Sequence, residues 1–487
     1  MFGDYVFEKS SAQYKEKLLI RDDENLNGKT DYISAFSAHG FEIINYADDL
    51  TFRIKYEELL KVSGKKIVIL AQTEQYVPFD VLRRLDVYDV SLDRLFPKLN
   101  LSSLKNMNRT ELDLLSEVYP FNFDDLQKKQ DTEKFLETKV YTRANVKAYL
   151  KKNVAKLIDK SKTAVQYNDW FAVAEAKSQL DVLAAKYDID ECTQEISRLF
   201  QHYILEYFGK LSQSIDRKSP VLASKALDYM HTYSDKFIVI VMDGMSEFDW
   251  NIISNSFVDF RYEKASMFAM VPSTTSVSRQ CLLSGKYPSQ LLEPWKQSKE
   301  KTEFIEGAKK LGYTNAQIGY DRGYNAQFNS FVRCGAVIIN DVDDIVHAQH
   351  QGRLGMFNDI TVLAKQKKLA NMVRGFINLG YDVYITADHG NTACVGMGKM
   401  MGTGVELETK SRKFIVLRDF ADKEKQQEKY KFVEFPKYYL PKEYVYLVCD
   451  VGESLDAKGE EVMTHGGLSI DEMVVPFITI RKAENNG

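Results

Sequence analysis

The chain has 487 residues, of which 44% are apolar and 28% charged, and its formal net charge is -4. These values are those of a soluble globular protein, and the length predicts two to four domains. No window approaches 18 uncharged apolar residues, which excludes a membrane span. A net charge of this size argues neither for nor against nucleic acid, because charge acts locally.

Five cysteines are scattered along the chain without a CxxC spacing. An odd number cannot all pair, and this spacing argues against a thiolate zinc site. The first residues contain no basic segment followed by an apolar core, so we expect no signal peptide. These features predict a cytoplasmic protein that does not enter a membrane.

Residues 1–122 are predicted to form a small α/β domain. Two apolar runs, 41–46 (FEIINY) and 66–71 (KIVILA), are predicted to be strands, with a helix over 56–62 between them. Strands that alternate with helices are typical of such a domain.

Residues 123–230 are predicted to form a helical connector or bundle. No Gly or Pro occurs over 124–208, and apolar residues recur there at the spacing of a buried helical stripe. Two rows of basic residues repeat at i+4, namely Arg143, Lys147 and Lys151, and Lys152, Lys156 and Lys160. Such rows can neutralise the phosphates of a nucleic acid, although a basic stripe is more often only a solvated helix face.

Residues 231–487 are predicted to form an α/β domain that carries the chemistry. Short apolar runs read as strands at 237–242, 336–339, 381–387, 414–417, 444–448 and 474–480. Polar helical stretches separate them, such as 358–379, which we expect to end at Gly380. Near-continuous apolar strands spaced this way predict a largely parallel sheet sandwiched by helices.

Two of these strands run into acidic residues at the edge where parallel sheets bind ligands. One is followed by Asp243 and Gly244, the other by Asp388, His389 and Gly390. A lone Asp after a strand is usually a turn or cap residue. Two such residues, one of them followed by His, indicate a functional edge.

A second group of candidate ligands lies in two separate segments. Asp343 and His347 are spaced i, i+4, which puts both side chains on one face of a helix, close enough to hold one metal. The neighbouring residues Asp341, Asp344 and His350 are competitors for these roles. His465 precedes two glycines on the loop that leads into the last strand.

Hydroxyl residues follow Pro272 where a helix is expected to begin. A hydroxyl at a helix N-terminus faces free N–H groups that favour an anion, so one of them is a candidate nucleophile. On this ground, either Thr275 or its neighbour Thr274 could be the nucleophile. Arg279 lies four residues after Thr275, so on a helix it would return to the same face and could hold a phosphate oxygen. A glycine- and methionine-rich stretch over 396–404 could form a lid.

These motifs, in this order, resemble the metal site of the alkaline phosphatase superfamily. Their order is similar to that in nucleotide pyrophosphatase/phosphodiesterases and cofactor-independent phosphoglycerate mutases. The HGGLSIDEMVVPF ending, the DHGN motif and the N-terminal segment YADDLTFRIKYEELL resemble PglZ-domain proteins. Those proteins occur in phage-defence systems of the BREX type and as the output domain of a response regulator.

The resemblance implies an alkaline-phosphatase-like α/β fold with two divalent ions, Zn²⁺ first and Mn²⁺ second. One ion would be held by Asp343, His347 and His465. The other would be held by Asp243, Asp388 and His389. Thr275, ten residues before Gly285 of the LLSGKYP segment, would be the nucleophile and would also reach a metal. This spacing favours Thr275 over Thr274.

We therefore expect a two-metal phosphodiesterase that acts on nucleotides, oligonucleotides or nucleic acid, in phage defence or signalling, with protein partners of a defence system. A phosphomonoesterase or phosphomutase uses the same metals and nucleophile and is one alternative. The other is a non-catalytic scaffold of a defence complex. A sulfatase is disfavoured, because no Cys-x-Pro-Ser-Arg segment stands at the nucleophile position.

Overall fold

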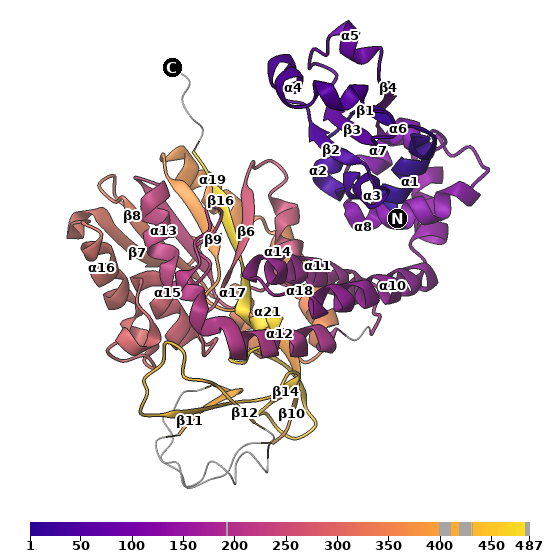
Figure 1. Ribbon diagram of the computed structural model, residues 1–487. Helices are drawn as coiled ribbons and strands as arrows, with labels where there is room; N and C mark the ends of the chain where they lie inside the picture. The colour runs from indigo at the N-terminus through magenta and orange to yellow at the C-terminus, as the bar shows by residue number, and fades with distance from the viewer. Residues whose placement is uncertain (191–192, 399–410, 418–429, 431, 483–487) are drawn as a thin grey trace. The chain divides into compact units, whose positions relative to one another are not determined.

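The computed structural model describes residues 1–190, 193–398, 411–417, 430 and 432–482 (Figure 1). The chain divides into two compact units, Met1–Tyr149 and Leu150–Gly487. The domain boundaries expected after residues 122 and 230 remain predictions. Within the described ranges, no helix combines the length and the apolar character needed to cross a membrane.

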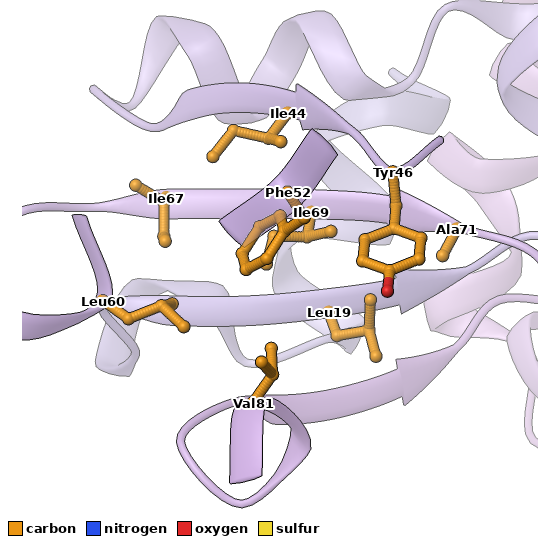
Figure 2. Packing of buried hydrophobic residues seen from close by; sticks show 9 residues of the cluster. All are labelled: Leu19, Ile44, Tyr46, Phe52, Leu60, Ile67, Ile69, Ala71 and Val81. Atoms are coloured by element: carbon orange, nitrogen blue, oxygen red, sulfur yellow. The ribbon is translucent and has the colours of Figure 1, made fainter. Parts of the chain in front are cut away.

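The first unit is built on a four-stranded parallel sheet in the order β2-β3-β1-β4. Its strands are β1 (Lys17–Arg21), β2 (Glu42–Asn45), β3 (Ile67–Ala71) and β4 (Asp86–Asp89). The strands predicted at 41–46 and 66–71 are confirmed as β2 and β3. Buried side chains of these strands, such as Leu19, Ile44 and Ile69, pack with Phe52 in a common core (Figure 2).

Short helices precede, connect and follow these strands along the chain. They are α1 (Phe2–Lys9), α2 (Leu26–Thr30), α3 (Ile33–Ala38), α4 (Asp49–Lys55), α5 (Phe79–Leu82), α6 (Leu92–Leu95), α7 (Leu101–Leu104), α8 (Arg109–Val118) and α9 (Lys129–Phe135). The helix predicted over 56–62 is a 3₁₀ helix at Glu57–Lys61. Tyr56 adopts φ -131°, outside the helical range, and therefore ends α4 before this turn.

The long segment without Gly or Pro is helical, as its composition predicts. It contains α10 (Arg143–Lys162), α11 (Tyr167–Lys186) and α12 (Gln194–Tyr207), with a π-helical turn at Leu136–Val140. Helices α11 and α12 belong to the second unit, together with the main sheet. Trp170 of α11 is buried there against the rings of Phe200 and Tyr203 of α12.

The second unit is built on a six-stranded sheet in the order β6-β16-β9-β5-β8-β7. Its strands are β5 (Phe237–Met242), β6 (Glu263–Phe268), β7 (Ile318–Arg322), β8 (Cys334–Ile339), β9 (Asp382–Thr386) and β16 (Val474–Ile480). Strand β16 runs opposite to the other five strands of this sheet, so the prediction of a largely parallel sheet is confirmed. Strands β5, β8, β9 and β16 are buried along their whole length, which explains their continuous apolar sequences.

Two predicted strands lie outside this sheet. The runs at 414–417 and 444–448 are β11 (Phe414–Leu417) and β13 (Val445–Val448), which pair antiparallel in a sheet with β12 (Val433–Glu434). An apolar run identifies a strand but not its partner, so their assignment to the parallel sheet is wrong. A third sheet joins β10 (Thr392–Gly396), β14 (Glu453–Ser454) and β15 (Glu461–Thr464).

Helices cover both faces of the main sheet (Figure 1). The second unit also contains α13 (Ala226–Tyr233), α14 (Glu247–Ile253), α15 (Gln280–Ser284), α16 (Glu300–Lys310), α17 (Asp341–Ala348), α18 (Gly352–Lys365), α19 (Lys368–Asn378) and the short α21 (Ile470–Met473). The single helix expected over 358–379 is divided between α18 and α19, because Lys367 adopts φ +55°. Gly380 follows α19 with φ +77°, as expected of a residue after a helix end.

Candidate metal centre

Three neighbouring strands of the main sheet end at one edge and supply the acidic residues of the site. Asp243 follows β5 directly, and Asp388 stands two residues beyond β9. The chain leaving β8 enters α17, whose first turn carries Asp343. Because β5, β8 and β9 are parallel neighbours, their carboxyl ends lie side by side. Gly244 turns the chain with φ +75°, a conformation that favours glycine, and a Cβ there would lie in ordinary van der Waals contact with Asp343.

The first group of side chains, the buried cluster, consists of Asp243, Asp388 and His389. Their ligand atoms lie within 4.8 Å of one another, and all three residues are buried. His389 Nε2 lies 3.7 Å from Asp243 Oδ1 and 3.8 Å from Asp388 Oδ2. Asp388 Oδ2 is buried and accepts no hydrogen bond from any described residue. Burying a carboxylate oxygen without a donor is costly unless a cation lies nearby. Arg279 Nη1 lies 3.6 Å from this oxygen but makes no hydrogen bond to it.

The second group, the outer cluster, consists of Asp343, His347 and His465, again with ligand atoms within 4.8 Å of one another. His347 Nε2 lies 3.4 Å from Asp343 Oδ2, and His465 Nε2 lies 3.5 Å from Asp343 Oδ1. The His347 side chain is 41% exposed, so this cluster is open to solvent. Of the competing residues, Asp341, Asp344 and His350 belong to neither cluster in the described part of the chain.

Backbone carbonyls orient two of the imidazoles. Nδ1 of His389 lies 3.0 Å from the Gly390 carbonyl, and Nδ1 of His465 lies 3.4 Å from the Ser273 carbonyl. A carbonyl can only accept, so each Nδ1 carries the hydrogen and each Nε2 presents its lone pair to its cluster. This is the usual arrangement of metal-binding histidines. The two rings stack with centroids 4.1 Å apart, which joins the clusters.

The concentration of charge in the site shifts several pKa values. Burial and the neighbouring Asp243 carboxylate raise the pKa of Asp388 to about 7. Burial and the nearby His389 imidazole lower the pKa of His465 to about 3, which keeps its ring neutral. Burial acts to raise the pKa of Asp343, but the hydrogen bond from His347 and the adjacent imidazoles outweigh it and lower that pKa.

The hydroxyl residues occupy the turn that leads into a helical segment. Thr275 begins a π-helical turn, Thr275–Arg279, which continues into α15. Its Oγ1 lies 3.0 Å from His389 Nε2 and 3.4 Å from Asp243 Oδ1, and its hydrogen can be donated to either. Thr274 caps the turn through its backbone carbonyl, and its own Oγ1 is buried without a hydrogen-bond partner among the described residues. The side chain that faces the buried cluster is therefore Thr275.

Arg279 contacts carboxylates of the protein instead of the expected phosphate. Its side chain is fully buried, with Nη1 2.6 Å from Asp243 Oδ2 and Nε donating to Glu300 Oε2 at 2.7 Å. Asp388 Oδ2 lies 3.6 Å from the same Nη1. The expectation of a phosphate contact is corrected, because the guanidinium is engaged by carboxylates and has no exposed surface. The i+4 spacing placed Arg279 near Thr275, but could not reveal these partners.

Asn391 of the DHGN motif ties the two strand ends together. Its Nδ2 donates to the Gly244 carbonyl at 2.9 Å and to Asp249 Oδ2 at 2.7 Å. Asp249 also accepts from the backbone and hydroxyl of Ser246, forming the capping box of α14. The turn after β5 is thereby held against the segment after β9.

A buried ion pair supports the loop of His465, and sequence reasoning missed it. Lys413 Nζ donates to Glu472 Oε2 at 2.9 Å, and both side chains are almost completely buried. Glu472 also accepts from the backbone of Gly467 and from Ser469. The Ser469-x-x-Glu472 capping box was a readable signal for one half of this arrangement. Its lysine partner, 59 residues away, had none.

The second unit has a largely parallel sheet with helices on both faces, the architecture of an α/β fold. The model of one family with this fold, described as the BREX system PglZ alkaline phosphatase-like domain, matches residues 221–480. The match spans 260 of the 487 residues, and the chain belongs to the PglZ family. The resemblance to PglZ-domain proteins is thus confirmed.

Solved structures with a similar fold include murine ectonucleotide pyrophosphatase/phosphodiesterase 5. It is 11% identical, over 51% of this chain and 89% of that chain, with a TM-score of 0.36. Phosphonoacetate hydrolase from Sinorhizobium meliloti 1021, in complex with phosphonoformate, is 13% identical over 52% of this chain and 92% of that chain, also at 0.36. No curated protein sequence matches the chain.

Proposed function

We propose that this chain is a two-metal phosphodiesterase that cleaves nucleotide, oligonucleotide or nucleic-acid phosphoesters through Thr275. A phosphoric ester hydrolase is the activity that an alkaline-phosphatase-like domain supports. The nucleophile, the metals and the substrate are our proposal. The observation that carries it is the position of Thr275 Oγ1, 3.0 Å from His389 Nε2 and 3.4 Å from Asp243 Oδ1.

The donors of the two clusters fit divalent metal ions. Each cluster offers carboxylate oxygens and at least one imidazole nitrogen, a set that suits Zn²⁺ first and Mn²⁺ second. Asp243, Asp388 and His389 would hold one ion, and Asp343, His347 and His465 the other. When bound, two such ions stabilise the attacking and leaving oxygens of an in-line displacement and lower the pKa of a hydroxyl.

The chain's own residues would then act in two displacements. Thr275 Oγ1 attacks phosphorus and forms a bond to it, while the bond from phosphorus to the leaving alcohol breaks. The hydroxyl proton passes from Thr275 to solvent, and the leaving oxygen takes up a proton from solvent and departs as an alcohol. Water next attacks the phosphorus of the threonine-bound intermediate, and the bond from phosphorus to Thr275 Oγ1 breaks. A phosphomonoester is released, and a proton from the water restores the hydroxyl. The N-terminus of the helical segment that begins at Thr275 favours the anionic phosphate.

A diester suits this site better than a monoester. A monoester brings two negative charges and needs additional cationic partners for its free oxygens. Two described basic side chains near the ligand residues are already paired, Arg279 with Asp243 and Glu300, and Arg412, which acts on the pKa of His347, with Asp456 at 3.1 Å. A diester brings a single charge and is less dependent on such a partner.

Turnover of the metal-loaded protein on four substrates tests the proposal. The panel consists of bis-p-nitrophenyl phosphate, p-nitrophenyl phosphate, a cyclic dinucleotide and single-stranded DNA. We expect a higher kcat/KM for the diester than for the monoester. Clear preference for the monoester would favour a phosphomonoesterase or phosphomutase. Failure to hydrolyse any of the four would favour a non-catalytic scaffold of a defence complex.

The biological setting that we propose is phage defence or signalling in the cytoplasm. The family model is described as a domain of the BREX system, which supports defence and protein partners from such a system. Recovery of the tagged chain from cells during phage infection would identify those partners, and the absence of any defence protein among them would oppose this setting.

A further inference from the structure

The buried Arg279 is part of a chain of ion pairs that leads from the buried cluster to the edge of the main sheet. Its partner Glu300 is the first residue of α16 and is itself buried. One carboxylate oxygen of Glu300 accepts from Arg279 Nε at 2.7 Å. The other accepts from the Tyr320 hydroxyl and from Arg322, both on the edge strand β7. Glu300 is therefore held from both sides.

Arg279 contacts only one of the two carboxylate oxygens of Asp243 and leaves the other oxygen facing the buried cluster. Nη1 of the arginine lies 2.6 Å from Oδ2. The other oxygen, Oδ1, faces Thr275 at 3.4 Å and His389 at 3.7 Å. A carboxylate fixed in this way presents one oxygen to its cluster and cannot rotate without losing its ion pair.

The positive charge of the Arg279 guanidinium also needs a compensating negative charge beside the buried cluster. Arg279 brings one positive charge next to Asp243 and Asp388, residues that would bind a cation themselves. By itself this charge would oppose a metal ion, because like charges repel at short range in a poorly solvated interior. Glu300 adds a compensating negative charge at Nε of the same guanidinium. The geometry thus holds Asp243 in position at little electrostatic cost to the cluster.

We propose that Arg279 and Glu300 are a positioning pair that sets the metal affinity of the buried cluster. This inference rests on the proposed two-metal function. Neither residue touches substrate, and both act through Asp243. Partners that orient metal ligands typically change metal affinity or activity by about 10–100-fold when they are substituted.

The experiment measures metal affinity rather than turnover. Apo-protein is titrated with Zn²⁺ against a chromophoric chelator, and Asp388→Asn and His347→Ala identify which affinity belongs to which cluster. Arg279→Lys keeps the charge, but one ammonium cannot hold Asp243 and Glu300 as a planar guanidinium does. We expect the affinity of the buried cluster to fall by about 10–100-fold, with the outer cluster unchanged.

Two further variants complete the test. Glu300→Gln keeps the shape and removes the charge, so it should weaken the same cluster, and combining it with Arg279→Lys should give less than the sum of both effects. It also carries the test if Arg279→Lys does not fold. Arg481→Lys is the matched control, because Arg481 pairs with Asp382 at the start of β9, away from Asp388.

Each result has a distinct meaning. Fewer than two ions bound by the unchanged protein would overturn the proposed two-metal function itself. Two ions in that protein, with both affinities unchanged in Arg279→Lys and Glu300→Gln, would overturn the positioning role alone. Equal weakening of metal binding at both clusters would also overturn the positioning role, because it would indicate a general loss of structure and not an effect through Asp243.

Discussion

Among the individual residues, the proposed nucleophile Thr275 should have the most direct consequence for activity. Its hydroxyl contacts the buried cluster, whereas that of Thr274 is buried without a hydrogen-bond partner among the described residues. Thr275→Val removes only the hydroxyl and keeps the volume. We expect kcat for bis-p-nitrophenyl phosphate to fall by at least about a thousandfold, as on loss of other nucleophiles, with the fold and bound metal retained.

Thr274→Val is the natural comparison and should have a milder effect. Circular dichroism and metal content, measured on both variants, establish that each is folded and loaded. The reverse order of effects would assign the nucleophile to Thr274. If both variants remained active, a covalent phosphothreonine would be excluded, and water would be the attacking group.

A second prediction for a single residue is made for Gly390, next to the proposed metal ligand His389. A Cβ on Gly390 would lie 2.0 Å from the backbone carbonyl oxygen of Asp471, which cannot move as a flexible side chain would. Gly390→Ala should therefore destabilise the second unit by about 1–3 kcal/mol, as overpacking commonly does. It should also weaken metal binding, because the Gly390 carbonyl orients His389.

Gly375 offers a matched control for this substitution. It lies within α19 and an added Cβ would meet nothing within 4 Å. Gly375→Ala should stabilise the protein by about 0.5–1 kcal/mol, because alanine is the better helix former. Urea unfolding of both variants checks the prediction, and equal stabilities would contradict the close approach at Gly390.

At the scale of elements, a network of four charges joins three helices of the second unit, with Lys177 and Asp181 buried at its centre. Lys177 of α11 contacts Asp181 at 2.6 Å and Asp471 of α21 at 2.7 Å. Arg353 of α18 contacts the same two carboxylates. Helix α21 in turn packs on the metal-site segment, since Gly390 N donates to the Glu472 carbonyl at 2.9 Å. The network thus links α11 to the segment that carries His389.

Breaking this network should destabilise the unit measurably. Lys177→Met leaves two buried carboxylates with Arg353 alone, and loss of one partner of a buried ion pair costs about 3–5 kcal/mol. Lys162→Met is the control, because its ammonium pairs with Asp159 at the surface and such pairs contribute about 0–1 kcal/mol. Calorimetry should show a much lower Tm only for Lys177→Met. Similar shifts in both would mean that the buried network contributes little.

At the scale of the whole molecule, the sequence allows prediction of features whose signal is local. An apolar run followed by Asp243 or by Asp388 and His389 indicates both a strand and its functional edge. Features that depend on distant partners could not be predicted. No sequence pattern indicates that Arg279 pairs with Glu300, or that β11 pairs with β13. Gly396–Gly398 are described, but the rest of the proposed lid over 396–404 lies outside the described residues.

The basic rows predicted from the sequence are exposed along α10. Arg143, Lys147 and Lys151, and Lys152, Lys156 and Lys160, all lie at its solvent side, while Val146, Leu150 and Val154 are buried. A polyanion that neutralises such cations releases counterions, so its binding weakens as salt rises. A small diester has no chain of phosphates that could extend along the helix. Substitutions in these rows should therefore weaken the binding of polymeric substrates only.

Charge reversal of one row tests this expectation. Lys152→Glu, Lys156→Glu and Lys160→Glu together should weaken binding of single-stranded DNA and reduce the slope of log K against log salt by about 2, at about 0.7 for each lost contact. The matched control reverses Lys309, Lys310 and Lys365, three exposed lysines of α16 and α18, with the same change in net charge. Hydrolysis of bis-p-nitrophenyl phosphate should stay unchanged in both variants. Equal loss of DNA binding in both would mean that only the net charge matters, and unchanged binding in both would remove α10 from substrate recognition.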